Sequence, residues 1–454
     1  MSLSEQRVPA FKQLSRKTIA TYAIGSLGTG GFATLPGLVL IFFLTDTLGV
    51  MPLLAGILVT VAKVWDVLID PVIGARSDHS LAVTGSRRRF MVLGAVLLPI
   101  FFVLTFAVPP GLSPLVSGLW VLVAFMATAT AFSLFQVPYI ALPAEIADGY
   151  HQRTRLLSVR VVVLTIAILL FGAGGPSLRK LGGDNEHLGY LIMAIVAGLV
   201  IGLGMFIASF VARTGVIAER PSTSIAESYR MGMAALKRSQ PFRALLLTFA
   251  LQGLATGIML AGAQYVAKWV LGDTNAVDIL FASLIAPALL FAPVWQAVAR
   301  RLGKERGFVI ASILFGVAAV SLIGMLWAPG PWIFVSVGLA GAGYAGMQSL
   351  PMAMLPDVAA VDAVRSGQNR IGVFTGVWTA GETTGMALGA TALTIVLAAT
   401  GYAESSGTAD VVQSGTAIGG IVLAFSAVPA VIIALSLVSF GRYHLRKADI
   451  DGFA

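Results

Sequence analysis

The chain has 454 residues, of which 57% are hydrophobic and only 11% are charged. Soluble globular proteins carry about 25% charged residues, so this composition excludes a set of soluble domains and predicts an all-α polytopic membrane protein. The absence of cysteine excludes disulfides and thiolate metal or redox centres, and the four histidines are too scattered to form a metal cluster.

Apolar runs long enough to cross a bilayer predict twelve transmembrane helices. An even number of crossings puts both termini on the same side of the membrane. The predicted spans, in chain order, are 19–44, 51–75, 90–108, 115–142, 157–176, 188–212, 242–270, 277–299, 308–327, 332–355, 371–399 and 414–440.

The positions of Lys and Arg predict the orientation, because cytoplasmic loops are enriched in these residues. Apart from Lys63, Arg179, Lys180 and Lys268, the 30 basic residues fall on the tails or loops that share a side with the termini. We therefore expect an integral protein of the plasma (inner) membrane with both termini cytoplasmic. The net charge of +9 is then a topology signal and not the sign of a nucleic-acid partner.

The longest charged connection follows the sixth span and divides the chain into two sets of six helices. Leu142-Pro143-Ala144-Glu145 in the first set is echoed by Leu355-Pro356-Asp357 in the second. A 6+6 repeat is typical of transporters whose halves rock about a site near the bilayer centre. The predicted parts are a cytoplasmic N-terminal tail (1–18), a six-helix bundle (19–212), a cytoplasmic central loop (213–240), a second six-helix bundle (241–440) and a cytoplasmic C-terminal tail (441–454).

The second predicted helix carries three charged residues inside an otherwise apolar run. Lys63, Asp66 and Asp70 are spaced i, i+3 and i+7, so they share one helix face. Three unpaired charges in a membrane would cost on the order of 10 kcal/mol, which indicates a function such as an ion pathway. The corresponding helix of the second set has no such acidic pair.

Three segments resemble one transporter family. They are residues 62–74 around the two aspartates, residues 137–142 with Arg160, and Leu355-Pro356-Asp357 followed by residues 376–379. These segments and the twelve-helix plan resemble the glycoside-pentoside-hexuronide:cation symporters, the melibiose permease-like family of the major facilitator superfamily. Sodium-dependent lysophospholipid symporters are similar in the same segments. The resemblance implies the 6+6 major facilitator fold with alternating access, and no cofactor beyond a coupling ion, Na⁺ or H⁺.

The resemblance also implies a coupling-cation site at Asp66 and Asp70, helped by Ser133, with Lys63 where the family usually has Arg. Two carboxylates and a hydroxyl are suitable ligands for a Na⁺ ion, and a close carboxylate pair can also share a proton. Ile69 stands where the family usually has Asn, which removes a neutral oxygen ligand and favours H⁺.

The substrate contacts that the resemblance implies differ more from the family pattern. Arg160 is retained. Gly30 stands where the family has an acid on the first helix. On the fourth helix, Gln136 stands where the family has an acid and Ile140 where it has a Trp. Trp378 and Glu382 of the eleventh helix complete the expected substrate-binding residues. These departures disfavour galactosides of the melibiose kind and leave less polar or amphiphilic substrates open.

Asp78 and the cluster Arg87, Arg88 and Arg89 are expected to form a cytoplasmic gate lock between helices. The sequence as a whole predicts a monomeric symporter that couples a small, sugar-like organic solute to Na⁺ or H⁺ within the lipid bilayer. Two alternatives are a cation-coupled carrier of lysophospholipids or other amphiphiles, and a non-transporting membrane assembly or receptor protein. No arrangement of nucleophile and base suggests an enzyme.

Overall fold

The computed structural model describes residues 14–147, 150–212, 234, 236–366, 371–405 and 411–445. Most of the predicted N-terminal tail, central loop and C-terminal tail lies outside the described residues. Within the described part, the regular structure is entirely helical, which confirms the all-α prediction.

The helices of residues 16–212, the first half, run in chain order as follows: α1 (Arg16–Ala23), α2 (Ser26–Phe42), the π-helix η1 (Phe43–Thr47), α3 (Pro52–Thr84), α4 (Arg88–Phe106), α5 (Pro114–Ile146), α6 (Tyr150–Leu178), η2 (Arg179–Gly182), α7 (Glu186–Ala208) and η3 (Ser209–Ala212). Those of the second half, residues 240–440, are α9 (Gln240–Tyr265), the π-helix η4 (Val266–Val270), α10 (Ala276–Leu302), α11 (Lys304–Ser321), η5 (Leu322–Leu326), α12 (Ile333–Ser366), α13 (Ile371–Ala399), α14 (Gly415–Phe425) and α15 (Ala427–Phe440).

These helices form twelve segments that are long and apolar enough to cross a membrane, as predicted. The boundaries differ most at the ends of the second and tenth spans, where α3 continues nine residues past the predicted end at 75 and α12 continues eleven past the predicted end at 355. The extra turns of α3 are largely polar, and this helix ends where Gly85 adopts a left-handed conformation at φ 67°. The twelfth predicted span is broken at Ser426 into α14 and α15.

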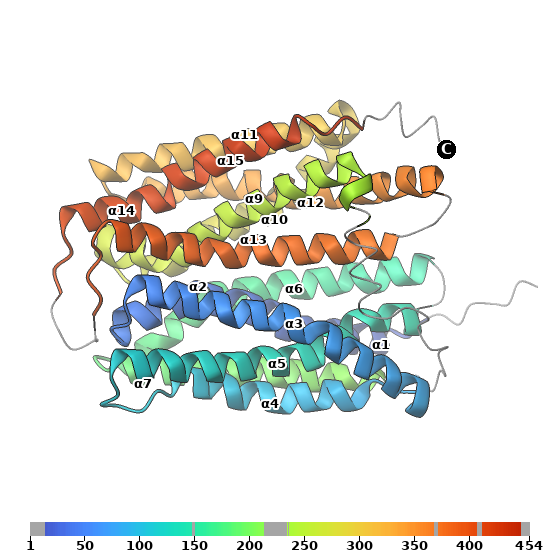
Figure 1. The fold of residues 1–454 in the computed structure, drawn as a ribbon, viewed down its shortest axis with the longest axis horizontal. Coiled ribbons are helices and arrows are strands. Elements are labelled where there is room, and N and C mark those ends of the chain that lie inside the picture. Colours follow the sequence, from blue (N-terminus) through green and yellow to red (C-terminus); the bar gives the residue numbers. More distant parts are fainter. Residues whose placement is uncertain are drawn as a thin grey trace, which may run out of the picture.

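The two halves lie side by side, with the first half in the lower part of Figure 1 and the second half in the upper part. The start of α1 and the end of α15 lie at one end of the bundle, which we call the terminal end. The opposite end, where the turns after η1 and α13 lie, we call the far end. Within each half the tightest neighbours are α4 with α5 and α9 with α13.

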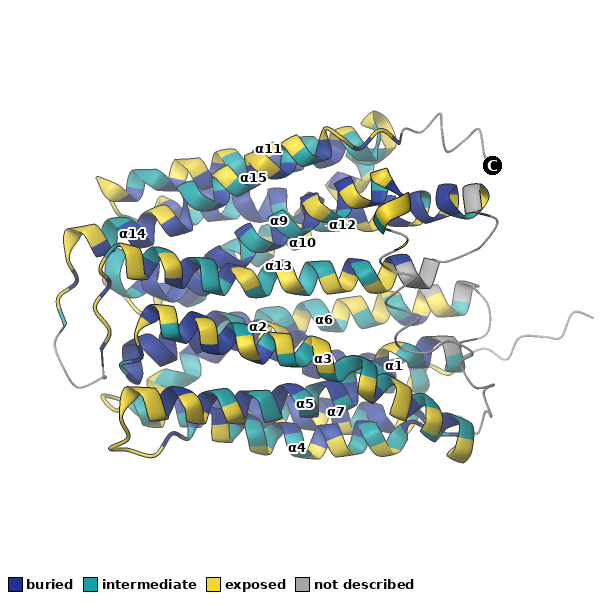
Figure 2. Cartoon of the chain, viewed as in Figure 1, coloured by how far each residue is buried: buried dark blue, intermediate teal, exposed yellow. Residues whose placement is uncertain are grey.

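The halves meet along three helix pairs, α3 with α13, α6 with α10, and α2 with α9. Helix α2 is almost fully buried, whereas α3, α6 and α10 alternate buried and exposed residues (Figure 2). In Figure 1 the ribbons of α3 and α13 separate toward the terminal end. The charged residues of α3 follow Thr60, which shares a hydrogen bond with Thr391 of α13, on the part of the helix that leads toward the terminal end.

Candidate cation and substrate site

Asp66 on α3 is held by two neighbours. Its Oδ1 accepts a hydrogen bond from Ser133 Oγ on α5 at 3.1 Å, and its Oδ2 lies 3.9 Å from Lys63 Nζ one turn earlier. The side chain of Asp66 is 14% exposed and that of Lys63 is 32% exposed. The structure thus brings together three of the four residues predicted for the cation site.

Asp70 lies one turn beyond Asp66 on the same helix. Its Oδ1 is buried and has no hydrogen-bond partner among the described atoms. A buried carboxylate oxygen without a partner is costly, so it marks a place where a cation or proton would bind. With Asp66 and Ser133, Asp70 adds oxygen atoms of the kind that hard cations prefer as ligands.

Arg160 on α6 lies against Tyr139 of α5, with its Cζ 5.4 Å from the ring centroid. Tyr139 is fixed by a hydrogen bond from its hydroxyl to the carbonyl of Tyr22 at 2.9 Å. The Nε of Arg160 and the Oε1 of Gln136 are both buried without a described hydrogen-bond partner. One donor and one acceptor are therefore free for a polar ligand.

Two other predicted substrate positions have different surroundings. A Cβ on Gly30 would lie 2.8 Å from the Cβ of Ala167 on α6, so Gly30 serves close packing of α2 against α6. Ile140 is 51% exposed, on the same helix as Gln136. Neither residue adds a polar group to the site.

In the second half, Trp378 is buried and stacks on Phe249, with ring centroids 4.3 Å apart. Glu382 lies one turn further along α13 and is partly buried. Thr391 of α13 shares a hydrogen bond with Thr60 of α3, and the two helices run in opposite directions. Each helical residue advances about 1.5 Å along the helix axis, so Glu382 lies about 13 Å along α13 from the threonine pair. The Asp66–Asp70 segment lies at a similar distance along α3, so the two are level with each other.

The predicted gating residues divide into two groups. Arg87 is buried and pairs with Asp78 at the end of α3 and with Glu145 Oε1 on α5, the latter at 2.5 Å. These ion pairs tie three helices of the first half together. They do not join the two halves.

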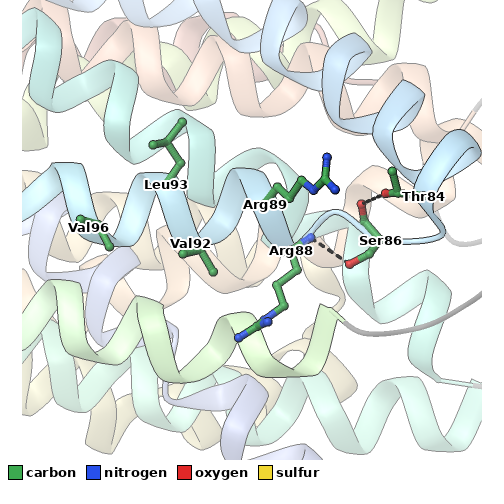
Figure 3. Close-up of a pocket in the computed structure, with 7 residues that line it drawn as sticks. All are labelled: Thr84, Ser86, Arg88, Arg89, Val92, Leu93 and Val96. Carbon is green, nitrogen blue, oxygen red and sulfur yellow. Dashed lines mark hydrogen bonds between the residues drawn. The ribbon is translucent and has the colours of Figure 1, made fainter.

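Arg88 and Arg89 line a shallow groove at the start of α4, where their side chains point to different sides (Figure 3). Arg88 lies over the ring of Phe210, with its Cζ 4.6 Å from the centroid. The rest of the groove is formed by Thr84, Ser86, Val92, Leu93 and Val96. The groove thus combines a basic rim with an apolar wall.

A second buried charge cluster at the far end was not predicted. Asp46, at the end of the first span, pairs with Lys268 at the end of the seventh, 2.9 Å apart. In the sequence, an acid and a base stand near the ends of the corresponding first and seventh spans, but neither segment by itself indicates that the two residues meet. In the part of the chain that the structure describes, no group of three or more His, Cys, Asp or Glu residues could hold a metal ion.

Comparisons with known proteins agree on one family. A family model described as MFS/sugar transport protein matches residues 21–447. The glucuronide carrier protein homolog of Escherichia coli K12 is 25% identical over 451 residues, which cover 96% of this chain and 93% of that protein. The isoprimeverose transporter of Lactiplantibacillus pentosus is 25% identical over 425 residues, which cover 90% of this chain and 85% of that protein.

Solved structures with the same fold are more distant in sequence. An inward-facing, unoccupied bacterial homolog of the human lysosomal transporter Spinster superposes with a TM-score of 0.65 at 13% identity, covering 94% of this chain and 95% of that one. The xylose transporter XylE of E. coli, in a partially occluded inward open conformation, superposes with a TM-score of 0.62 at 14% identity, covering 95% of this chain and 99% of that one.

Proposed function

Because the chain belongs to the MFS/sugar transport protein family, we propose that it is a symporter that couples uptake of a sugar or glycoside to a cation gradient. The observation that carries the proposal is the hydrogen bond from Ser133 to Asp66 beside the unpartnered carboxylate oxygen of Asp70. The names of the relatives, which include a putative glycoside/cation symporter of E. coli, support the same activity.

The coupling ion, Na⁺ or H⁺, would bind at Asp66, Asp70 and Ser133. Before it binds, two carboxylates face one nearby ammonium group, that of Lys63. Cation binding removes the remaining negative charge. The face of α3 can then move past the other half with a smaller desolvation cost.

The substrate would bind where the two halves diverge, between the Arg160 region and α13. The free Nε of Arg160 and Oε1 of Gln136 supply a donor and an acceptor for hydroxyl groups of a sugar. Glu382 lies level with the cation site on the opposite half and offers a second acceptor. The apolar exposed surface of Ile140 suits an aglycone or the apolar face of a sugar ring.

The arrangement in the membrane follows the charge pattern. Both termini would be cytoplasmic in the inner membrane, with two six-helix bundles joined by a cytoplasmic loop, and the protein would act as a monomer. The far end of the bundle is then the outer face. No cofactor would be needed besides the coupling ion.

Uptake into proteoliposomes tests the proposal. A panel containing a glucuronide, isoprimeverose and lysophosphatidylcholine would be offered with an inward Na⁺ gradient, an inward proton gradient or neither. We expect gradient-driven accumulation of a sugar, and its loss in Asp66→Asn and Asp70→Asn. Asp184→Asn, in an exposed turn, is the matched control and should behave like the unmodified protein.

The outcomes separate the alternatives. Normal accumulation in both Asp66→Asn and Asp70→Asn would refute the coupling site. Accumulation of lysophosphatidylcholine and none of the sugars would support the amphiphile carrier instead. Binding of a ligand without accumulation of any, unaffected by Na⁺ or pH, would support a non-transporting receptor.

A further inference from the structure

A network of buried polar side chains joins the two halves at the far end. Asp46 is fully buried, and its carboxylate accepts hydrogen bonds from Lys268 at 2.9 Å and from the hydroxyl of Tyr402 at 2.5 Å. Asp46 belongs to the first half, whereas Lys268 and Tyr402 belong to the second. We call these three residues the far-end triad.

The helix ends that carry the charged pair share an unusual geometry. Asp46 lies in the π-helix η1 at the end of the first span, and Lys268 lies in the π-helix η4 at the end of the seventh. A glycine with φ 66° follows each segment, Gly49 in the first half and Gly272 in the second. π-helical turns are rare and occur often at functional sites, so a matched pair at equivalent positions indicates a shared role.

Neighbouring contacts seal the space around the triad. Thr45 shares a hydrogen bond with Tyr265 at 2.6 Å across the halves, and its carbonyl accepts from Ser405 N at 2.9 Å. Trp269 Nε1 donates to the Tyr402 hydroxyl at 2.8 Å. Aromatic rings therefore pack around the Asp46 carboxylate, which is fully buried, whereas the Lys268 side chain is 23% exposed.

The terminal end has a different pattern. Among the described residues, its ion pairs stay within a half or its adjoining loop, as in Arg87 with Glu145 and Lys304 with Asp357. Ion pairs between the halves occur at the far end, where Lys180 of the first half also pairs with Asp278 of the second at 3.1 Å. The two ends are thus held by different means.

We infer that the far-end triad is the outer gate of the transport pathway, closed in this structure and broken once in each transport cycle. This inference rests on the proposed function and on cytoplasmic termini. Separation of the halves at the far end must separate Asp46 from Lys268. Removal of one partner leaves the other buried and uncompensated, so it should favour the state in which water reaches both.

Cysteine accessibility can test the gate, since the natural chain has no cysteine. Leu260 on α9 faces Gly37 of α2 across the halves and lies two turns inside Lys268, so Leu260→Cys reports opening of the far end. A membrane-impermeant maleimide would be applied to whole cells without substrate. Thr274→Cys, in an exposed far-end turn, controls for protein amount and for sidedness.

We expect Asp46→Asn and Lys268→Gln each to raise the labelling rate of the Leu260→Cys reporter at least tenfold. The charge swap Asp46→Lys with Lys268→Asp should return it toward the starting value. Lys304→Gln, which breaks an ion pair within the second half, should leave it unchanged. Tyr402→Phe, which removes one hydroxyl, should raise the labelling rate severalfold. This variant tests the gate if a charge variant fails to reach the membrane.

Unchanged labelling in the triad variants, or an equal rise in Lys304→Gln, would overturn the gate. No labelling of Thr274→Cys from outside would overturn the orientation on which the gate depends. The measurement needs no transport, so it is independent of the uptake assay. A labelling response without accumulation of any solute would therefore count against the proposed function and not against the gate.

Discussion

The hydroxyl of Ser133 on α5 donates a hydrogen bond to the carboxylate of Asp66 on α3, 3.1 Å away and 67 residues apart in the chain. The contact ties the charged face of α3 to a second helix of the same half. It also fixes the direction in which one Asp66 oxygen points. The site can therefore be dissected one ligand at a time.

Ser133→Ala should weaken Na⁺ binding and leave the fold intact, because it removes one of the oxygen ligands proposed for the ion. The half-saturating Na⁺ concentration should rise roughly 10- to 100-fold. In a proton-coupled carrier the same change should instead tighten H⁺ binding, because the hydrogen bond that stabilises the Asp66 carboxylate is lost. Uptake measured over a range of Na⁺ concentrations and pH values checks this. Ser209→Ala is the control, because that buried hydroxyl donates only to its own helix at Phe206. Equal effects in both variants would contradict the role of Ser133.

Lys63→Gln should strengthen cation binding. Lys63 competes with the coupling ion for Asp66, but its partial exposure screens the interaction to about 1 kcal/mol. The half-saturating cation concentration should then fall about fivefold, more at low ionic strength. Cation titrations of uptake at two ionic strengths measure it. A weaker apparent affinity would instead make Lys63 part of the binding site.

Arg87→Gln should destabilise the first half. Arg87 pairs with Asp78 and Glu145 and also donates to Ser77 at 2.8 Å. Its removal leaves the mostly buried carboxylate of Glu145 without a cation, whereas Asp78 is partly exposed. Breaking a buried pair in this way costs about 3–5 kcal/mol. Thermal unfolding in detergent should show a lower melting temperature, partly restored by the additional change Glu145→Gln. No restoration would show that the Glu145 charge is not the cause.

Gly385→Ala should force α9 and α13 apart. A Cβ on Gly385 would lie 2.3 Å from the carbonyl oxygen of Ala250 on α9, and overpacking of this kind costs about 1–3 kcal/mol. Gly376→Ala on the same helix meets no described atom within 4 Å and should be neutral or slightly stabilising. Melting temperatures of the two variants, measured side by side, test the difference. A similar drop in both would point to a backbone effect.

Much of the fold could be predicted from the sequence, because apolar length and the excess of basic residues act through the bilayer itself. The twelve spans and the all-α class were predicted in this way. The end of α3 was not, since residues 76–84 leave the apolar run while their backbone remains helical to Gly85. Hydropathy detects where a helix leaves the membrane and cannot detect where it ends.

The candidate cation site could be proposed from the sequence because charged residues are costly on an apolar helix. Ser133 was placed by resemblance alone, and its contact with Asp66 needed the packing of α5 on α3. Asp46 and Lys268 were missed for the opposite reason: each stands at the edge of its span, where a charge is unremarkable by itself. Their pairing depends on how two halves meet, which no local pattern encodes.

The burial of Asp46 has a consequence for the speed of the cycle. An ion pair removed from water gains attraction and loses hydration in nearly equal amounts, so its net contribution to holding two surfaces together is small. A purely apolar seal of the same area would grow stronger with every side chain added. The ion pair of the far-end triad can therefore fix one closed arrangement of the two halves while the energy barrier to their separation stays low.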